Sequence, residues 1–446
     1  MSKSRIMTQG SETGCIVSFT LPLLAGNLLQ QTYNVADTMI VGKYLGDSSL
    51  AAVGATGSIT YLFYTLCIGL SIGAGVLISQ YFGSGRLDRV RAAVVNSAVI
   101  TLIFALIATL PAVVLARPIL GALGVPGDLL SRSVTYMRIA CAGTVCVAAY
   151  NWINSVMRAL GDSKTPLIFL AVSTVLNVCL DLLFVIVFKA GVGGAALATI
   201  LSQGVSAVGC IIYCFKTNPD IRPKRDELHT DPVLMKKCVT TGLPIAAQNG
   251  LVSVSMVALQ SVTNGFDETV MAAYTASMRI EQLVQQPFIS LGAAVTAFTG
   301  QNIGAGKEER AVRGLKASLK ISSVFAVVMF IIFTLFGKNI MGIFVSGEQT
   351  IKIGALALIL TGCCYVPLGS IHTTRGFLNG TGDTGYALVN GLTEVICRIG
   401  FSLILTRIPF ISWKGIWITT SITWIATGAV GLLRYKGGKW RLKAIE

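Results

Sequence analysis

Long apolar stretches follow one another along nearly the whole chain and are separated by short polar segments. Each has roughly 20 residues or more, the length that an α-helix needs to cross the roughly 30 Å apolar core of a bilayer. We expect twelve transmembrane helices, at 16–42, 51–82, 92–115, 133–158, 166–188, 192–215, 237–264, 271–301, 311–336, 353–378, 386–406 and 414–434. The pattern therefore predicts an all-α integral membrane protein.

The first half of the chain returns in the second half, 221 positions later. Gln80 corresponds in this way to Gln301, and the dipeptide 161–162, Gly-Asp, corresponds to 382–383. Six spans are an even number, so both halves begin on the same side of the membrane and form parallel repeats. We expect two six-helix lobes, 1–215 and 237–446, joined by a cytoplasmic linker at 216–236.

Composition and charge agree with a membrane protein. Of the 446 residues 53% are hydrophobic and 12% are charged, whereas soluble domains carry about 25% charged residues. The densest basic clusters, 216–237, 307–320 and 434–443, fall on one side, which indicates that both termini are cytoplasmic. The net charge of +15 then reflects topology and contact with anionic lipid, not nucleic-acid binding.

No cleavable signal peptide is evident in the polar first residues of the chain. We expect a bacterial or archaeal inner-membrane protein.

Several motifs look chemical but are better explained as structure. The Gly-x-Gly loops at 83–85 and 304–306 and the two Gly-Asp turns are interpreted as helix-ending turns. Residues 380–383 have the Gly-x-Gly-Asp form of intramembrane aspartyl proteases, but no Tyr-Asp dipeptide accompanies them. The eleven cysteines lie mostly within spans and are read as small fillers between helices rather than disulfides or metal ligands. We therefore expect neither an enzyme nor a cofactor, and any pumping should be powered by an ion gradient or by the substrate itself.

Ionisable residues inside spans are functional candidates, because a charge at the centre of the hydrocarbon costs about 3 kcal/mol or more. The candidates are Asp37, Asp181, Arg138, Arg279, Glu281, Glu394 and Arg398.

Polar residues of the first lobe are predicted to converge. Gln30, Tyr33 and Asp37 share one helical face, and Asn177 is one turn from Asp181. At 1.5 Å rise per residue, four polar residues fall at one depth, roughly 8–10 Å below the outer surface. These four are Asp37, Asp181, Thr199 and Tyr136. Asn177 lies one turn deeper.

Such a cluster suits a small cation. Its oxygens are ligands that a hard cation such as Na⁺ accepts, so Na⁺ is possible at Asp37, Asn177, Asp181 and Thr199. A proton would relieve the excess negative charge of two carboxylates without demanding ligand geometry. We favour H⁺ and keep Na⁺ as the alternative.

The second lobe differs from the first at these positions. Arg398 and Ser402 stand where Asn177 and Asp181 stand in the first repeat, and Glu394 is one turn before Arg398. The sequence predicts an internal ion pair there. Glu281 remains a candidate for the substrate cavity.

The chain resembles the multidrug and toxic compound extrusion (MATE) family, and in particular its DinF-like branch. The motifs are Pro22 with 31–42 (Gln-Thr-Tyr-Asn-Val-Ala-Asp-Thr-Met-Ile-Val-Gly), 80–85, 158–162, Asn177-x-x-x-Asp181 and 300–306. The NorM-like branch of this family uses carboxylates on spans 7 and 10, and this sequence has no Asp or Glu in 237–264 or 353–378.

The resemblance implies a V-shaped pair of six-helix bundles that exports organic cations or amphiphilic drugs in exchange for H⁺ or Na⁺. It also assigns roles to residues of the first lobe. Positions matching Asp37, Asn177, Asp181 and Thr199 form the cation site, those matching Gln30, Tyr33 and Asn154 line the drug cavity, and Pro22 matches a hinge in span 1. We expect a monomer whose partners are drug-like small molecules and membrane lipid.

Other classes fit less well. A lipid-linked oligosaccharide flippase of the same fold is the nearest alternative, but it should line its cavity with several cations, and we identify only Arg138, Arg279 and Arg398. A membrane enzyme lacks a nucleophile and base at usable spacing, and a channel or receptor does not explain the duplicated lobes.

Overall fold

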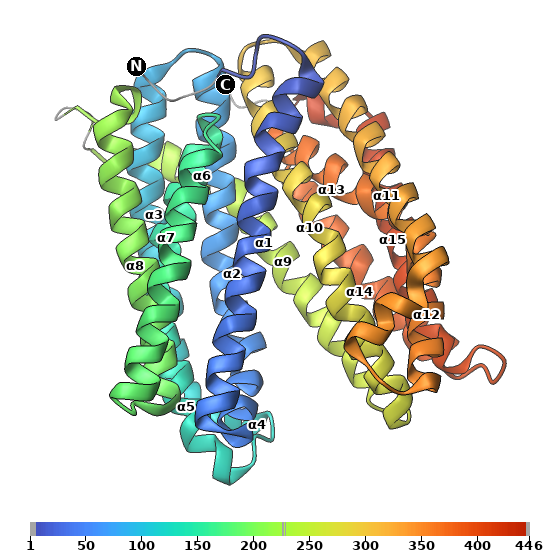
Figure 1. The fold of residues 1–446 in the computed structure, drawn as a ribbon. Helices are drawn as coiled ribbons and strands as arrows, with labels where there is room; N and C mark the ends of the chain where they lie inside the picture. Colours follow the sequence, from blue (N-terminus) through green and yellow to red (C-terminus); the bar gives the residue numbers. More distant parts are fainter. Residues whose placement is uncertain (1–5, 225–226, 228, 443–446) are drawn as a thin grey trace. The chain divides into compact units, whose positions relative to one another are not determined.

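The computed structural model describes residues 6–224, 227 and 229–442, and the secondary structure throughout this part of the chain is helical (Figure 1). Nine of the described helices are long and apolar enough to cross a membrane. Two bent pairs, α5 with α6 and α12 with α13, add one span each, bent by 43° and 49°. The remaining long helix, α10, is more polar. Together they confirm the expected twelve-helix fold.

The chain divides into two compact units. The first unit contains residues 21–246. Its elements are the greater part of α1 (Glu12–Leu45), α2 (Asp47–Gly83), α3 (Leu87–Val114), α4 (Ala116–Ala122), α5 (Gly127–Ala142), α6 (Thr144–Ala159), α7 (Lys164–Asp181), the π-helix η1 (Leu182–Val187), α8 (Gly191–Thr217), η2 (Pro219–Ile221) and the start of α9 (Pro232–Thr263). Within it α7 lies beside α8, and α2 packs against α3, α5 and α6 (Figure 1).

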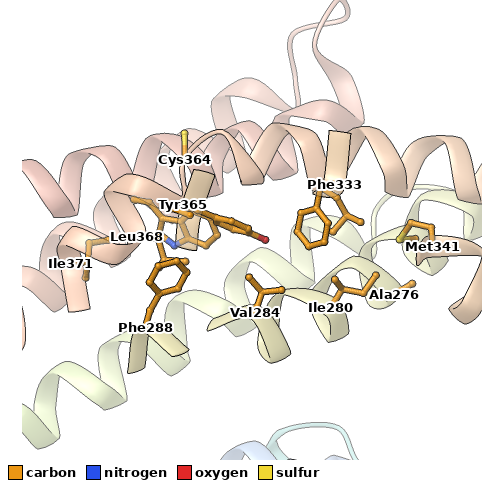
Figure 2. Close-up of a cluster of buried hydrophobic side chains, with 13 residues drawn as sticks. Ala276, Ile280, Val284, Phe288, Phe333, Met341, Cys364, Tyr365, Leu368 and Ile371 are labelled. Carbon is orange, nitrogen blue, oxygen red and sulfur yellow. The ribbon is translucent and has the colours of Figure 1, made fainter. Parts of the chain in front are cut away.

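The second unit contains residues 7–20 and 247–446. Its further elements are α10 (Glu268–Gly304), α11 (Glu308–Phe344), α12 (Glu348–Gly362), α13 (Tyr365–Gly380), α14 (Gly385–Leu405), η4 (Ser412–Lys414), α15 (Gly415–Lys436) and η5 (Lys439–Leu442). Helix α10 packs against α11, α12 and α13, and α14 packs against α15. Buried aliphatic and aromatic side chains, among them Phe288, Phe333 and Tyr365, form an apolar cluster in this unit (Figure 2).

The repeat is visible in the helix boundaries. Helices α2 and α10 both have 37 residues, and each bound of α10 lies 221 positions after that of α2. The breaks that separate α5 from α6 and α12 from α13 also correspond. The turn glycines match too: Gly161 and Gly382 have φ of 81° and 89°, a left-handed conformation that other residues rarely adopt. The Gly-Asp motifs are therefore confirmed as turns that end one helix and start the next.

The units depart from the expected lobe boundaries at two places. Helix α1 passes from the second unit into the first at residue 21, directly before Pro22, and α9 passes from the first into the second after Ala246, close to Pro244. Proline removes one backbone hydrogen bond from a helix. The two prolines thus mark equivalent points in both repeats, and the hinge role of Pro22 stays a prediction.

Charged contacts hold the segment before each of these two helices. In the second unit, Arg310 donates to the carbonyl oxygens of residues 7, 9 and 10 and lies 3.4 Å from the Glu12 carboxylate. In the first unit, Arg91 donates to both carboxylate oxygens of Glu227 at 2.6–2.9 Å, which lowers the pKa of Glu227 to about 2. Asn96 accepts from the backbone N–H of Asp231 there, at 2.7 Å. These contacts fix where α1 and α9 begin.

Close helix packing in the second unit gives a first prediction. A Cβ atom on Gly376 of α13 would collide with the carbonyl oxygen of Gly292 on α10, whereas one on Gly400 of α14 would meet nothing within 4 Å. Gly376→Ala should therefore destabilise the protein by about 1–3 kcal/mol through overpacking. The control Gly400→Ala should be neutral or stabilising by about 0.5–1 kcal/mol, because alanine favours helix. Thermal unfolding in detergent measures both, and equal melting temperatures would contradict the proposed close contact.

Candidate cation site in the first unit

Two carboxyl groups from different helices meet inside the first unit. Asp37 is on α1 and partly buried, and Asp181 is the last residue of α7 with 0% exposure. Their carboxyl groups lie close enough for a hydrogen bond between them. Two ionised carboxylates have only acceptors, so a hydrogen bond between them needs a proton on at least one. This contact is the chemical centre of the candidate site.

Hydroxyl and amide groups surround the carboxyl pair. The Tyr33 hydroxyl donates to Thr199 Oγ1 at 3.3 Å, and Asn177 Nδ2 donates to the same oxygen at 3.4 Å. Thr199 Oγ1 in turn donates to the carbonyl oxygen of Ala195 at 3.2 Å. Thr199 on α8 therefore links α1 to α7 one turn from the carboxyl groups.

The backbone around Asp181 changes from α-helix to π-helix. The segment η1 begins at Leu182, and the chain then turns through Lys189, which has a φ of 51°. Helix α8 starts at Gly191 and packs closely on this turn, since a Cβ on Gly194 would lie 3.0 Å from side-chain carbons of Phe184 and Ala190. π-Helical turns often occur at functional sites. Here the turn directly follows Asp181 and leads into α8, the helix that carries Thr199.

The other predicted site residues of the first unit differ in how they relate to this cluster. Tyr136 on α5 lies close enough to interact electrostatically with both carboxyl groups, so it joins the cluster. Gln30 is an exposed side chain of α1. Asn154 on α6 is 7% exposed and interacts with Tyr150. The structure thus brings five of the predicted polar residues around Asp181, with Gln30 and Asn154 at separate positions.

The second unit contains an ion pair and a polar network. Arg398 is fully buried and its Nη2 lies 2.9 Å from Glu394 Oε1, which confirms the predicted pair. Its Nη1 donates to Ser255 on α9. Next to them, the Asn390 amide oxygen accepts from Arg375 at 2.6 Å and from Gln248 at 2.7 Å. These groups join α9, α13 and α14.

Arg375 is missing from the candidates that we selected from the sequence, although it lies in the predicted span 353–378. Its position in an apolar run was the signal that would have identified it. Two candidates from that set belong elsewhere: the side chains of Arg138 and Arg279 are exposed, and Arg138 donates to the carbonyl oxygen of Val113 at 3.2 Å. These two therefore do not contribute a buried charge to either unit.

The described part of the chain holds no group of three or more His, Cys, Asp or Glu side chains that fits a metal ion. All eleven cysteines are free. The donor set at Asp37 and Asp181 consists of oxygens and is compatible with a proton or with Na⁺.

A bundle of membrane-crossing helices in two repeats, with buried carboxyl groups inside one unit, is the architecture of a membrane transporter. The chain matches the family model MatE over residues 22–183 and 244–404, and it belongs to that family. The match comprises more than two thirds of the chain and includes both repeats.

Relatives and solved structures agree with this assignment. The chain is 28% identical over 443 residues to "Probable multidrug resistance protein YpnP" of Bacillus subtilis (strain 168), covering 98% of each chain. It superposes on a crystal structure of MATE in the bent conformation with a TM-score of 0.92, at 23% identity and 99% coverage of each chain. An outward-facing multidrug resistance MATE family transporter gives a TM-score of 0.91 at the same identity and coverage.

Proposed function

We propose that this protein is a secondary antiporter that exports cationic or amphiphilic organic compounds in exchange for protons. The carboxyl–carboxyl contact of Asp37 with Asp181 is the observation that carries the proposal. Relatives named as multidrug resistance proteins support small organic compounds as the transported class. Export from a bacterial or archaeal cytoplasm by a monomer, with both termini cytoplasmic, completes the proposal.

A proton accounts for the contact between the carboxyl groups more simply than Na⁺ does. One proton shared by the pair removes a buried negative charge and supplies the hydrogen-bond donor that two carboxylates lack. Na⁺ would need Asp37, Asn177, Asp181 and Thr199 as ligands. In the structure, however, Asn177 directs its Nδ2 donor toward Thr199 Oγ1. That geometry favours the proton.

Coupling follows from competition for the same charge. An organic cation that reaches the first unit is stabilised by ionised Asp37 and Asp181, whereas protonation removes that attraction. Binding of one species therefore weakens binding of the other by the same factor. For a neutral amphiphilic compound, a proton moving through a membrane potential of 100 mV releases about 2.3 kcal/mol, enough for roughly a fiftyfold gradient of the exported compound. Exchange of a monovalent organic cation for one proton moves no net charge, so that exchange is driven by the pH gradient. Tyr33, Gln30, Asn154 and Glu281 are proposed to line the path of the compound.

The test separates the two ions. Inverted vesicles containing the protein should take up a fluorescent organic cation when a proton gradient is imposed, and Asp181→Asn should abolish that uptake. Asn177→Ala and Thr199→Ala should reduce it only modestly, because neither side chain carries the proton. The variant Asn264→Ala, at the exposed end of α9, is the matched control and should transport normally.

Two outcomes would overturn the assignment. Uptake driven by a Na⁺ gradient alone, and lost in Asn177→Ala and Thr199→Ala, would make Na⁺ the coupling ion. Full uptake by Asp181→Asn with either gradient would remove the first unit as the ion site.

A further inference from the structure

Two buried polar groups meet inside the apolar cluster of the second unit, and each has an atom without a hydrogen-bond partner. Glu281 on α10 is 8% exposed, and its Oε1 has no partner among the described residues. The hydroxyl of Tyr365 on α13, a residue with 0% exposure, is likewise without one. Unsatisfied polar atoms in an apolar interior cost about 1–3 kcal/mol each. Their occurrence at one place marks it as a candidate site.

Thr361 on α12 connects the two groups. It is fully buried and interacts with both Glu281 and Tyr365. Its hydroxyl donates to the carbonyl oxygen of Ala357 at 3.1 Å, so its oxygen still has a lone pair with which to accept. Three helices therefore bring one carboxyl and two hydroxyl groups together.

The ring of Tyr365 is held firmly. It packs against Phe288, Phe333 and Trp424 with ring centroids 5.8–6.3 Å apart. Figure 2 shows the Tyr365 hydroxyl directed toward Phe333 and Val284, and Val284 lies on the same helix as Glu281, one turn on. The aromatic packing thus aims the hydroxyl at the site and leaves it little freedom to turn elsewhere.

The charged groups near Glu281 do not supply it with a counter-ion. Arg398 on α14 acts on Glu281 electrostatically, but it forms its ion pair with Glu394 at 2.9 Å. The titratable neighbours are Tyr274, on the same helix α10, and Tyr365 on α13. The cluster residues of α11 and α15 are uncharged. Among the described ion pairs none includes Glu281, so an ionised carboxylate there would be buried without a counter-ion.

We propose that Glu281, Thr361 and Tyr365 form a second proton-binding site, located in the second unit. A protonated Glu281 has an O–H that can donate to Thr361 and a carbonyl oxygen that can accept from Tyr365. One proton therefore satisfies both unpartnered atoms and removes the buried charge. This site goes beyond the antiport proposed for Asp37 and Asp181. It is not a duplicate of that site, since Thr60 stands 221 positions before Glu281.

A bound metal cation and a purely structural role both fit this site less well than a proton does. A hard cation takes about six oxygen ligands, and this site offers a carboxyl and two hydroxyls. If residue 281 had only a structural role, an amide side chain would serve better, because an amide can hydrogen-bond with the two hydroxyls and cannot ionise. Helix α10 has glutamine at 282, 285 and 286, so the carboxyl at 281 is the exception along this helix.

Infrared difference spectroscopy on the purified full-length protein tests the site directly, without any transport assay. The carbonyl stretch of protonated buried carboxylic acids should appear as the pH is lowered. Because Asp37 and Asp181 contribute to this absorption as well, the Glu281 band is defined as the component that is lost in Glu281→Gln. The control Glu268→Gln, at the exposed start of the same helix, should retain it. Tyr365→Phe and Thr361→Val should shift the band, because each removes one hydrogen-bond partner of the acid.

Each outcome decides the proposal. A spectrum that is unchanged in Glu281→Gln, or a Glu281 band that Tyr365→Phe and Thr361→Val leave in place, would overturn it. Displacement of the Glu281 band of the wild type by Na⁺ at constant pH would make this a sodium site instead. If Glu281→Gln is poorly folded, the shift in Tyr365→Phe alone decides the question. Because Asp37 and Asp181 stay intact in all these variants, a negative result here leaves the proposed antiport untouched.

Discussion

Replacing Asp37 by Asn is expected to reduce proton-driven export to the background of vesicles without protein. The amide keeps the size of the side chain and a hydrogen bond to Asp181, but it cannot release or accept a proton in the working range of pH. The charge that would attract an organic cation also disappears. Initial rates of dye uptake by inverted vesicles, normalised to the amount of folded protein, measure the effect.

The control for this variant is Asp47→Asn, an exposed aspartate in the first turn of α2. It makes the same chemical change outside the carboxyl cluster and should transport at the wild-type rate. Thermal stability of Asp37→Asn in detergent should equal or exceed that of the wild type, because removal of a desolvated charge is favourable. Wild-type export by Asp37→Asn would show that Asp37 has only a structural role.

Breaking the ion pair of the second unit is expected to lower stability more than transport. Glu394→Gln leaves the Arg398 guanidinium, 0% exposed, without its closest carboxylate. Removing one partner of a buried pair costs about 3–5 kcal/mol. The double variant with Arg398→Gln removes both charges and should cost clearly less, since the destabilisation of the single variant comes from the charge left behind.

Melting temperatures in detergent and export per folded molecule separate stability from function here. We expect the double variant to melt below the wild type yet to transport at a similar rate per folded molecule. Complete loss of transport in a stable double variant would show that Glu394 and Arg398 take part in coupling the proton to the exported compound. A single variant as stable as the double would mean that Arg398 finds another counter-charge, for which the nearby Glu281 is the available carboxylate.

The helices and their repeat could be predicted from the sequence, because the hydropathy pattern that indicates each helix is local. Apart from a residue or two at its ends, each predicted span lies within one helix, one bent pair or, for 166–188, α7 with the π-helix η1, as for 237–264 and α9 (Pro232–Thr263). Backbone groups must be satisfied within a segment when lipid surrounds it, so a long apolar run fixes a helix wherever it occurs. The offset of 221 positions between the repeats is also the offset between the bounds of α2 and those of α10.

The depth of a polar residue in the membrane could also be predicted from the sequence. The residues that surround it could be predicted only in part. Counting residues from the outer ends predicted that Asp37, Asp181 and Thr199 lie at one level. The structure brings Asp37 to Asp181, and Thr199 to Tyr33, one turn before Asp37. The same reasoning selected Arg138, whose side chain is exposed, and did not select Arg375. Residue counts give a position along a helix axis but not the direction in which the helix turns its side chains toward other helices.

The amino-acid sequence by itself determined the membrane class, the helices, the duplication and the residues in which a charge would be costly. These follow from hydropathy and from the helical period, which act over a few turns of chain. The tertiary structure alone decided that the carboxyl groups of Asp37 and Asp181 touch, and that Glu281 meets Tyr365 and Thr361 from two other helices. Such contacts depend on how far each helix rotates and bends as it packs, for instance at the 49° break between α12 and α13, and no local pattern records that rotation.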